Sequence, residues 1–497
     1  MKIHRKAYML CPKACPDDGF KTKYELTSMY ELRCGKDTEI RSLVQGEHAV
    51  YLIGVFVHCQ DADILDDQIL QELIRCADDV QKAVKYTSLL AGHFLVILVN
   101  QEQIYVLPDA CTTYCTAYTQ LNGVSYAASN PKIIADLFHI PISLKMQDMK
   151  ENTNIGEALP NNKTLYEEIV VMLPNHYLDF NTGRTCRVYP CMWQGEKKVD
   201  QIGKDSACIL QTIIQGLLKK KSLSLPLTGG VDSRTILAAI GKERADQVVY
   251  YTYRHEHDGM NISDIKIPQK ITSEYGLEYQ LIDLVAASEQ EMGYYQKEIE
   301  EDSEVFTPNL CSTYRRSRNA GRCFLSGGIA PIGKSVYGNT LPECLCIPSY
   351  LLTKAHNSSF SAYKEIKEWM REIKPYCKKY NISIFDMFYW EYRCGRWDQR
   401  THLYTDARIG MVSPYNCAYL LQMWLLVPRA MRQKKYIHTQ IIEQCWPELN
   451  TYPLNPDSWM YVWVKRHPYV YWVLSYILWA KESILRKKKL LMRNICG

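Results

Sequence analysis

The sequence lacks the apolar segments that mark membrane-spanning and secreted proteins. The nearest candidate, residues 469–480, is shorter than the roughly 18–20 apolar residues that a membrane-spanning helix requires. The basic start, residues 1–6, leads into no apolar stretch of the kind found in a signal peptide. We therefore expect a soluble, cytoplasmic protein.

Metal-binding cysteine spacing and a strong charge of one sign are also absent. The 19 cysteines are odd in number and scattered, and no C-x2-C pair has a matching partner. We expect them to be reduced thiols. The 59 basic and 54 acidic residues are mixed along the chain and leave a net charge of +5. This balance gives no reason to expect a nucleic-acid partner.

The chain, 497 residues long, is long enough for two domains, and its pattern changes near residue 200. The first part reads as short β-branched and aromatic strands interrupted by one helix at residues 67–90, which indicates layered sheets in an α+β domain. A polar, glycine-containing segment, residues 192–205, is typical of a boundary. The expected strands of the first part are 49–57, 93–99, 103–107 and 123–128.

Beyond the boundary, expected strands alternate with expected helices. This order predicts a parallel sheet with crossover helices, an α/β domain. After about residue 347 the pattern is mostly helical and ends in a basic tail. The strands are expected at 222–227, 247–253, 278–283 and 323–326, and the helices at 232–241 and 264–275.

A glycine-rich loop lies where the first of these strands becomes a helix. The paired glycines, Gly229 and Gly230, let the backbone approach a ligand closely. The N–H groups at the start of the helix favour phosphate, the hydroxyls of Thr228 and Ser233 add donors, and Asp232 can hold magnesium. No lysine follows the glycines, which excludes the G-x4-G-K-[ST] phosphate loop. Residues 227–234 are therefore predicted to bind a nucleotide phosphate.

This loop resembles the S-G-G-x-D-S loop of ATP pyrophosphatases, with Thr228 in the first position. Further segments are similar to the asparagine synthetase family, most of all to its members in polysaccharide and natural-product gene clusters. The resemblance implies an Ntn-type glutaminase-like domain over residues 1–195 and an ATP-pyrophosphatase domain over residues 205–497. The segments that carry it are 90–94, Asp109, 127–132, 164–169, 173–176, 391–397, 413–415 and 446–449.

The sequence departs from the family at the glutaminase nucleophile. Working members have cysteine as residue 2, whose amine and thiol attack glutamine. This chain has Lys2, and the internal Cys11 cannot supply a terminal amine. The stretch at residues 52–54 also lacks the family's Asn-Gly-Glu. We expect no glutamine hydrolysis, and a first domain retained as a scaffold.

A second departure follows the fourth strand of the synthetase half. Active members have Ser-Gly-x-Gly-x-Asp-Glu there, and the aspartate shares magnesium with the loop aspartate. Ser326, Gly327 and Gly328 are kept, but the segment up to Lys334 contains no carboxylate. In place of the missing carboxylate and its metal, Lys334 offers a positive point charge to the phosphates. The alternative is a site that binds nucleotide without catalysis.

The resemblance also implies roles for residues outside the two loops. Glu391, with Arg393, either meets the acyl-adenylate or forms a buried ion pair, and Asp264 is either a ligand or an ordinary charge at a helix start. One of Arg432, Lys434 and Lys435 would bind pyrophosphate. The catalytic residues implied are Asp232, Glu391 and Lys434, with Asp232 as the metal ligand; the nucleotide contacts are Leu227, Thr228, Gly229, Gly230, Val231, Asp232, Ser233, Arg234, Thr252, Tyr253, Ser326, Gly327, Gly328 and Lys334.

The implied activity is that of an ATP- and magnesium-dependent, AMP-forming ligase. It would adenylate a carboxylate for attack by an amine or ammonia. The alternative is a non-catalytic nucleotide-binding homologue that serves as a partner protein in a biosynthetic cluster. A homodimer is compatible with the sequence. The aromatic and basic tail, residues 468–497, either packs on its own domain with its lysines in solvent or lies on an anionic membrane.

Overall fold

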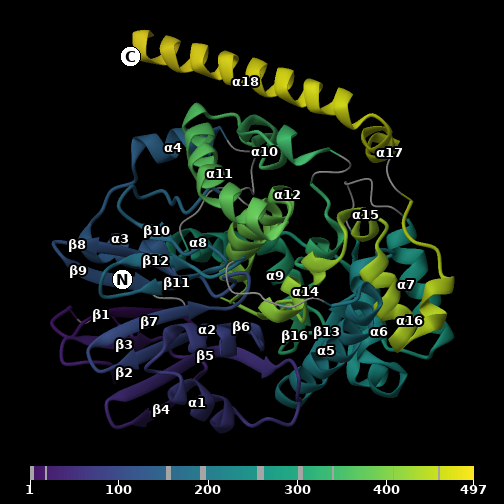
Figure 1. Ribbon diagram of the computed structural model, residues 1–497, viewed down its shortest axis with the longest axis horizontal. Helices are drawn as coiled ribbons and strands as arrows, with labels where there is room; N and C mark the ends of the chain where they lie inside the picture. The colour runs from purple at the N-terminus through teal and green to yellow at the C-terminus, as the bar shows by residue number, and fades with distance from the viewer. Residues whose placement is uncertain are drawn as a thin grey trace.

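The computed structural model describes residues 5–16, 19–152, 158–190, 197–254, 262–299, 306–337, 341–406, 408–456 and 459–496. It has a mixed α/β architecture with two antiparallel sheets and one parallel sheet (Figure 1). The antiparallel sheets occupy the N-terminal part of the chain, and the parallel sheet and most helices the remainder. Within this described part, no helix combines the length and apolarity needed to cross a membrane.

The N-terminal part is built from two six-stranded antiparallel sheets. The first has the order β10-β8-β9-β1-β3-β2, with β1 (Tyr8–Pro12), β2 (Thr22–Glu25), β3 (Tyr30–Cys34), β8 (Ala117–Leu121), β9 (Val124–Ala128) and β10 (Val170–Val171). The second has the order β12-β11-β7-β6-β5-β4, with β4 (Ile40–Gln45), β5 (His48–His58), β6 (Leu90–Asn100), β7 (Gln103–Pro108), β11 (His176–Asp179) and β12 (Arg184–Arg187).

These sheets form a four-layer sandwich because both faces of the second sheet are apolar. Along β5, Tyr51 and Ile53 face the first sheet in one core, whereas Val50 and Leu52 pack in another core with α1 (Asp66–Arg75) and α2 (Val80–Thr87). This is the two-residue alternation of a strand. Helix α3 (Pro131–Phe138) covers the outer face of the first sheet. The layered sheets and their expected strands are confirmed.

One element of this region differs from the expectation. The single helix predicted at 67–90 is two helices, and residues 88–90 lead into β6. The helix stops at Cys76, and the side chain of Asp79 then accepts hydrogen bonds from the backbone N–H groups of Gln81 and Lys82. An aspartate at this position caps a new helix, so the polar stretch that seemed to be helix interior is a turn and a cap.

The parallel sheet has five strands in the order β15-β14-β13-β16-β17. They are β13 (Leu223–Pro226), β14 (Val248–Arg254), β15 (Tyr279–Asp283), β16 (Cys323–Leu325) and β17 (Gly410–Val412). The predicted parallel sheet is confirmed, but β17 was not foreseen because three residues give no pattern. The helices around it are α5 (Val199–Lys220), α6 (Val231–Ile240), α7 (Ser263–Glu274), α8 (Glu289–Glu298) and α9 (Phe306–Arg316), with the 3-10 helix η1 (Lys242–Gln247).

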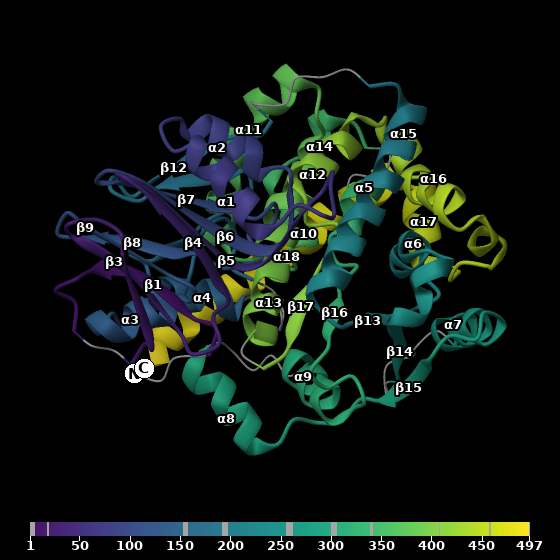
Figure 2. The ribbon, with the colours of Figure 1, turned by 90° about the horizontal axis from the view of Figure 1, so that it is seen from below.

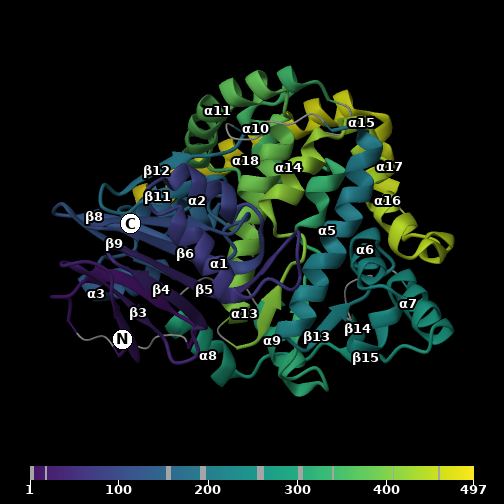
Figure 3. The same cartoon turned by 60° about the horizontal axis from the view of Figure 1, so that its bottom comes forward.

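The C-terminal region is mainly helical, as predicted. Figures 2 and 3 show these helices beside the parallel sheet and over the sandwich. They are α10 (Pro348–Lys354), α11 (Phe360–Tyr380), α12 (Ile384–Phe388), the π-helix η4 (Tyr389–Asp398), α13 (Gln399–Asp406), α14 (Ala418–Leu426), α15 (Arg429–Arg432), α16 (Tyr436–Cys445), α17 (Trp459–Arg466) and α18 (Pro468–Cys496). Shorter elements are α4 (Leu144–Glu151) and the 3-10 helices η2 (Ala330–Lys334), η3 (Glu343–Leu345) and η5 (Pro447–Thr451).

The two parts of the chain share one hydrophobic core. Val57, Ala91 and Cys111 of the sandwich are buried in the same cluster as the inner face of α5 and the C-terminal helices. Gly216 of α5 lies so close to β5 that a Cβ atom there would be 3.0 Å from a methyl of Val57. Half of the segment predicted as a boundary, residues 199–205, is the first part of α5, and residues 191–196 lie outside the described part.

Candidate functional site

The site is built at the edge of the parallel sheet where the chain changes direction. From β13 the chain passes to β14 and β15 on one side, and it later enters β16 and β17 on the other. The loops after β13 and β16 therefore lead away from each other at the carboxyl ends of adjacent strands (Figure 2). Open parallel sheets bind ligands in the crevice at such a switch point. Both predicted loops, residues 227–230 and 326–334, lie here.

The first loop is shaped by its own hydroxyl groups. The backbone N–H of Thr228 donates to Oγ of Ser233 at 3.1 Å, and the N–H of Gly230 donates to Oγ1 of Thr228 at 3.3 Å. Helix α6 then begins at Val231 with no side chain bonded to its N-terminus. The helix start therefore keeps backbone donors for an external anion, while Thr228 and Ser233 fix the turn.

Gly229 lies so close to its neighbours that a larger residue there would displace them. A Cβ atom there would be 2.0 Å from Oδ1 of Asn455 and 3.0 Å from the backbone oxygen of Ser263. The N–H of Gly229 donates to Oδ1 of Asp264 at 3.0 Å, and Nδ2 of Asn455 donates to the same oxygen. A carboxylate oxygen therefore lies against a loop amide, so Asp264 is more than an ordinary charge at a helix start.

Asp232 carries the central negative charge of the site. Its Oδ2 is 2.6 Å from Nζ of Lys334, so the second loop brings a lysine to the first. Its Oδ1 accepts no hydrogen bond from any described residue and lies 3.7 Å from Nε2 of His438. Burial lowers the pKa of His438 to about 4. The imidazole is therefore neutral near pH 7, and the charge pairing is with Lys334.

The second loop packs closely on the first. A Cβ atom at Gly327 would be 3.4 Å from Cβ of Asp232, and one at Gly328 would be 3.2 Å from Oδ1 of Asp398. The N–H of Gly328 donates to Oγ of Ser326 at 3.2 Å. Ser326, Gly327 and Gly328 thus form a tight turn between two aspartates that are distant in sequence.

Asp398 is a site residue that the sequence did not reveal. It ends the π-helix η4, it is 4% exposed, and its Oδ2 has no hydrogen-bond partner among the described residues. Nε2 of His402 lies 3.9 Å from this oxygen. Burial raises the pKa of the Asp398 carboxyl to about 7. A π-helix often marks a functional position, but nothing in the spacing of residues 389–398 announces one.

Arg234 supports the loop from behind. Its guanidinium donates to the backbone oxygens of Tyr452 and Pro453, both at 2.7 Å, and to that of Gly229 at 3.3 Å. Burial lowers the pKa of Arg234 to about 10, which leaves it charged at neutral pH. These contacts tie the loop to residues 449–453, and the guanidinium engages carbonyl groups instead of the crevice.

Thr252 and Leu227 fix the base of the loop to the neighbouring strand. The hydroxyl of Thr252 donates to the backbone oxygen of Leu227 at 2.6 Å, and the N–H of Leu227 donates to the oxygen of Tyr251 at 2.8 Å. Tyr253 follows in β14 with its ring edge-on to that of Tyr251. Burial raises the pKa of Tyr253 well above its usual range, so this phenol stays protonated.

Glu391 lies away from the two loops. Its carboxylate is bonded by Arg187 at 2.5 and 3.1 Å, by Nε1 of Trp369 at 2.8 Å and by Nδ2 of Asn175 at 3.1 Å. Arg187 belongs to β12, so this buried ion pair joins the sandwich to the π-helix. Of the two readings that the sequence left open for Glu391, the geometry favours the ion pair.

The three basic residues at 432–435 have different surroundings. Arg432 is buried and pairs with Asp386 at 2.6 Å, which excludes it from a free cationic role. Lys434 is exposed between α15 and α16. Burial lowers the pKa of His438, and the positive charges of Lys334 and then Lys435 lower it further.

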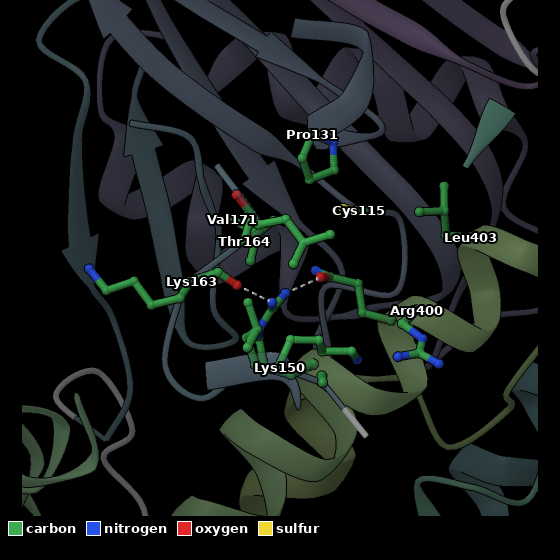
Figure 4. Close-up of a pocket in the computed structure, with 13 residues that line it drawn as sticks. Cys115, Pro131, Lys150, Lys163, Thr164, Val171, Arg400 and Leu403 are labelled. Carbon is green, nitrogen blue, oxygen red and sulfur yellow. Dashed lines mark hydrogen bonds between the residues drawn. The ribbon is translucent and has the colours of Figure 1, made fainter. Parts of the chain in front are cut away.

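Several cavities of the described part lie away from the two loops. Figure 4 shows a small one, with Lys150, Lys163 and Arg400 on its wall. Its volume of about 30 Å³ is enough for one or two water molecules. A larger cavity of about 580 Å³ borders α2, β7, β11 and α14 and includes Lys85 and His176. Neither is lined by residues of the two loops.

The similarity of this chain to known proteins is weak. No family model matches the chain, and neither does any curated protein. Among solved structures, glutamine-dependent NAD+ synthetase from Acinetobacter baumannii with ADP is similar at 12% identity and a TM-score of 0.19, over 37% of this chain and 39% of that one. Glutamine phosphoribosylpyrophosphate amidotransferase from B. subtilis with ADP and GMP is similar at 8% identity and a TM-score of 0.22, over 64% and 90%. The chain thus spans well under half of the first protein, and TM-scores this low carry no argument about function.

Proposed function

We propose that this chain binds ATP at residues 227–234 and 326–334 and acts as an asparagine synthetase-like, AMP-forming ligase. The observation that carries the proposal is the pair of loops at the switch point of the parallel sheet, joined by Asp232 and Lys334 at 2.6 Å. A helix start with backbone donors, a closely packed glycine at residue 229 and a lysine are features that suit a polyphosphate. The three meet at one crevice.

In the proposed reaction a carboxylate oxygen of the substrate attacks the α-phosphorus of ATP. The bond to pyrophosphate breaks, and an acyl-adenylate forms. An amine or ammonia then attacks the acyl carbon, loses a proton, and AMP leaves. The chain contributes by holding the phosphates with the amides of the loop and with Lys334, since phosphoryl chemistry depends on positioning and charge neutralisation.

A magnesium ion fits the first loop in part. Oδ1 of Asp232 is buried and has no hydrogen-bond partner among the described residues, so it is available as a metal ligand, and Oδ2 is held by Lys334. Across the same described ranges, no group of three or more His, Cys, Asp or Glu side chains is arranged to hold a metal. Such an ion would therefore be coordinated by Asp232 and by the phosphate oxygens whose charge the ion neutralises.

In the proposed reaction glutamine is not the nitrogen donor. Cys11 is 0% exposed inside β1, so it cannot reach a substrate, and Lys2 lies outside the described residues. The sandwich then acts as a scaffold, and the amine or ammonia comes from solution or from another protein. Release of glutamate from glutamine by the purified chain would contradict this part of the proposal.

ATP–pyrophosphate exchange, screened with a panel of carboxylate substrates, tests the activity, and calorimetric titration tests ATP binding. Asp232→Ala is expected to abolish exchange and to weaken ATP binding in the presence of magnesium by at least about tenfold. Asp246→Ala, an exposed aspartate in η1, is the matched control and should change neither.

A second candidate function is nucleotide binding without catalysis. It is favoured by the second loop, residues 326–334, which has no carboxylate near Pro331, where active members of the resembled family have one. ATP binding with no exchange for any carboxylate would support this candidate. Absence of ATP binding would contradict both.

A further inference from the structure

The C-terminal helix α18 leaves an apolar face uncovered. One face packs on the domain: Nε1 of Trp472 donates to the backbone oxygen of Leu345 at 2.8 Å, and Nε1 of Trp479 donates to that of Asn357 at 3.2 Å. The opposite face carries large apolar side chains that are 42–59% exposed. They are Val470, Val473, Leu474, Ile477, Leu478 and Ile484.

Their spacing shows that these side chains form a stripe along one helix face. Residues 470, 473, 474 and 477 follow the i, i+3, i+4, i+7 pattern, and Ile484 lies on the same face beyond the exposed Lys481. A helix that is apolar on both faces is expected to be buried on both, and exposed apolar surface that is continuous marks an interaction site. In Figure 1 this helix lies along the outer edge of the molecule, with no other element beyond it.

Exposed aromatic residues precede the stripe in the sequence and also lie within its length. Trp459 of α17 is 80% exposed, and Trp463, Tyr469 and Tyr476 are also exposed. Tryptophan and tyrosine favour the boundary between lipid headgroups and acyl chains, because one part of each ring system is apolar and the other is a hydrogen-bonding group. The stripe and these aromatic residues therefore suit a lipid surface.

Charge distinguishes an anionic surface from other occupants. Residues 468–497 contain six basic residues and one acidic residue: Lys481, Arg486, Lys487, Lys488, Lys489 and Arg493 against Glu482. Two copies of this segment would bring like charges together, which costs free energy. Anionic lipid headgroups attract a basic segment. The segment is thus better matched to anionic lipid than to itself.

We infer that α17 and α18 bind the surface of an anionic membrane, with the stripe of residues 470–484 in the headgroup region and α18 parallel to the bilayer. A helix of 29 residues is about 43 Å long, so it offers an extended contact. Helices of this kind lie in the interface without crossing it. The contact would hold the proposed ATP site at a membrane.

Flotation of the full-length chain with vesicles tests this inference. Vesicles of phosphatidylcholine with about 30% phosphatidylserine should carry the chain, and vesicles of phosphatidylcholine alone should carry much less. Val473→Glu/Ile477→Glu should lower the partition coefficient at least about tenfold, since it places charge in the stripe. The matched control, Val44→Glu/Leu65→Glu, changes two exposed apolar residues on β4 and before α1 and should float normally.

A second pair of variants tests the charge. Lys487→Gln/Lys488→Gln/Lys489→Gln should lower partitioning on the order of a hundredfold. A triple variant of the exposed Lys36, Lys204 and Lys266 to Gln has the same net charge and should bind as the natural chain does. Equal flotation with both vesicle types, flotation with neither, or a dimer in solution that the stripe variant dissociates would overturn the inference.

Discussion

Replacing Glu391 with alanine should destabilise the folded chain, not remove a catalytic group. Glu391 is 2% exposed, and its carboxylate is bonded by three side chains, those of Arg187, Asn175 and Trp369. Removing one partner of a buried ion pair costs about 3–5 kcal/mol, because the other charge stays buried. Arg187 keeps a second contact, with Glu372 at 2.8 Å. We therefore expect the lower end, about 3 kcal/mol.

Urea denaturation of the natural chain, of Glu391→Ala and of Arg187→Met/Glu391→Leu measures this cost. The double variant removes both charges and keeps apolar volume, so it should regain most of the lost free energy of unfolding. Folded Glu391→Ala should still bind ATP. If Glu391→Ala unfolds like the natural chain but loses ATP–pyrophosphate exchange, the ion-pair reading is refuted and Glu391 is catalytic.

Two further predictions concern the loops. Gly229→Ala would place Cβ 2.0 Å from Oδ1 of Asn455 and should weaken ATP binding by at least about tenfold in calorimetry, whereas Gly293→Ala, with open space around it, should not. The pKa of Asp398 is raised from 3.8 to about 7, so the unfolded chain loses this proton first. Asp398 should therefore cost stability progressively from about pH 4 to pH 7, by roughly 4 kcal/mol in total. The urea midpoint of Asp398→Asn should therefore fall less between pH 4 and pH 7 than the midpoint of the natural chain. An equal fall in both proteins would contradict this prediction.

Repeating patterns made much of the fold predictable. Apolar runs with β-branched and aromatic residues located β5, β6, β7 and β9, and alternating strands and helices indicated the parallel sheet. Short elements were beyond reach, since β17 has three residues. The break at Cys76 was missed because the apolar spacing of α1 and α2 looks continuous until the capping role of Asp79 is considered.

The residues that meet at the candidate site were predictable only where they are contiguous in sequence. The order hydroxyl, Gly, Gly, Asp, Ser identified the first loop, and Lys334 could be inferred from the second. Contacts between residues far apart in sequence could not be predicted. Examples are the hydrogen bond from the amide of Gly229 to Asp264 and the position of Asp398 beside Gly328. The sequence also does not show in which direction a side chain points. For this reason Arg234 is predicted to contact the ligand, whereas its guanidinium donates hydrogen bonds to backbone carbonyls.

The core shared by the sandwich and α5 has a consequence for the modularity of the chain. Since Val57, Ala91 and Cys111 are buried with α5 and the C-terminal helices, cutting the chain near residue 197 would expose a large apolar wall on each fragment. We therefore expect that neither fragment folds on its own and that heating melts both parts in one cooperative step. Even if it performs no chemistry of its own, the N-terminal sandwich would be indispensable as the inner wall against which the proposed ATP-binding half is assembled.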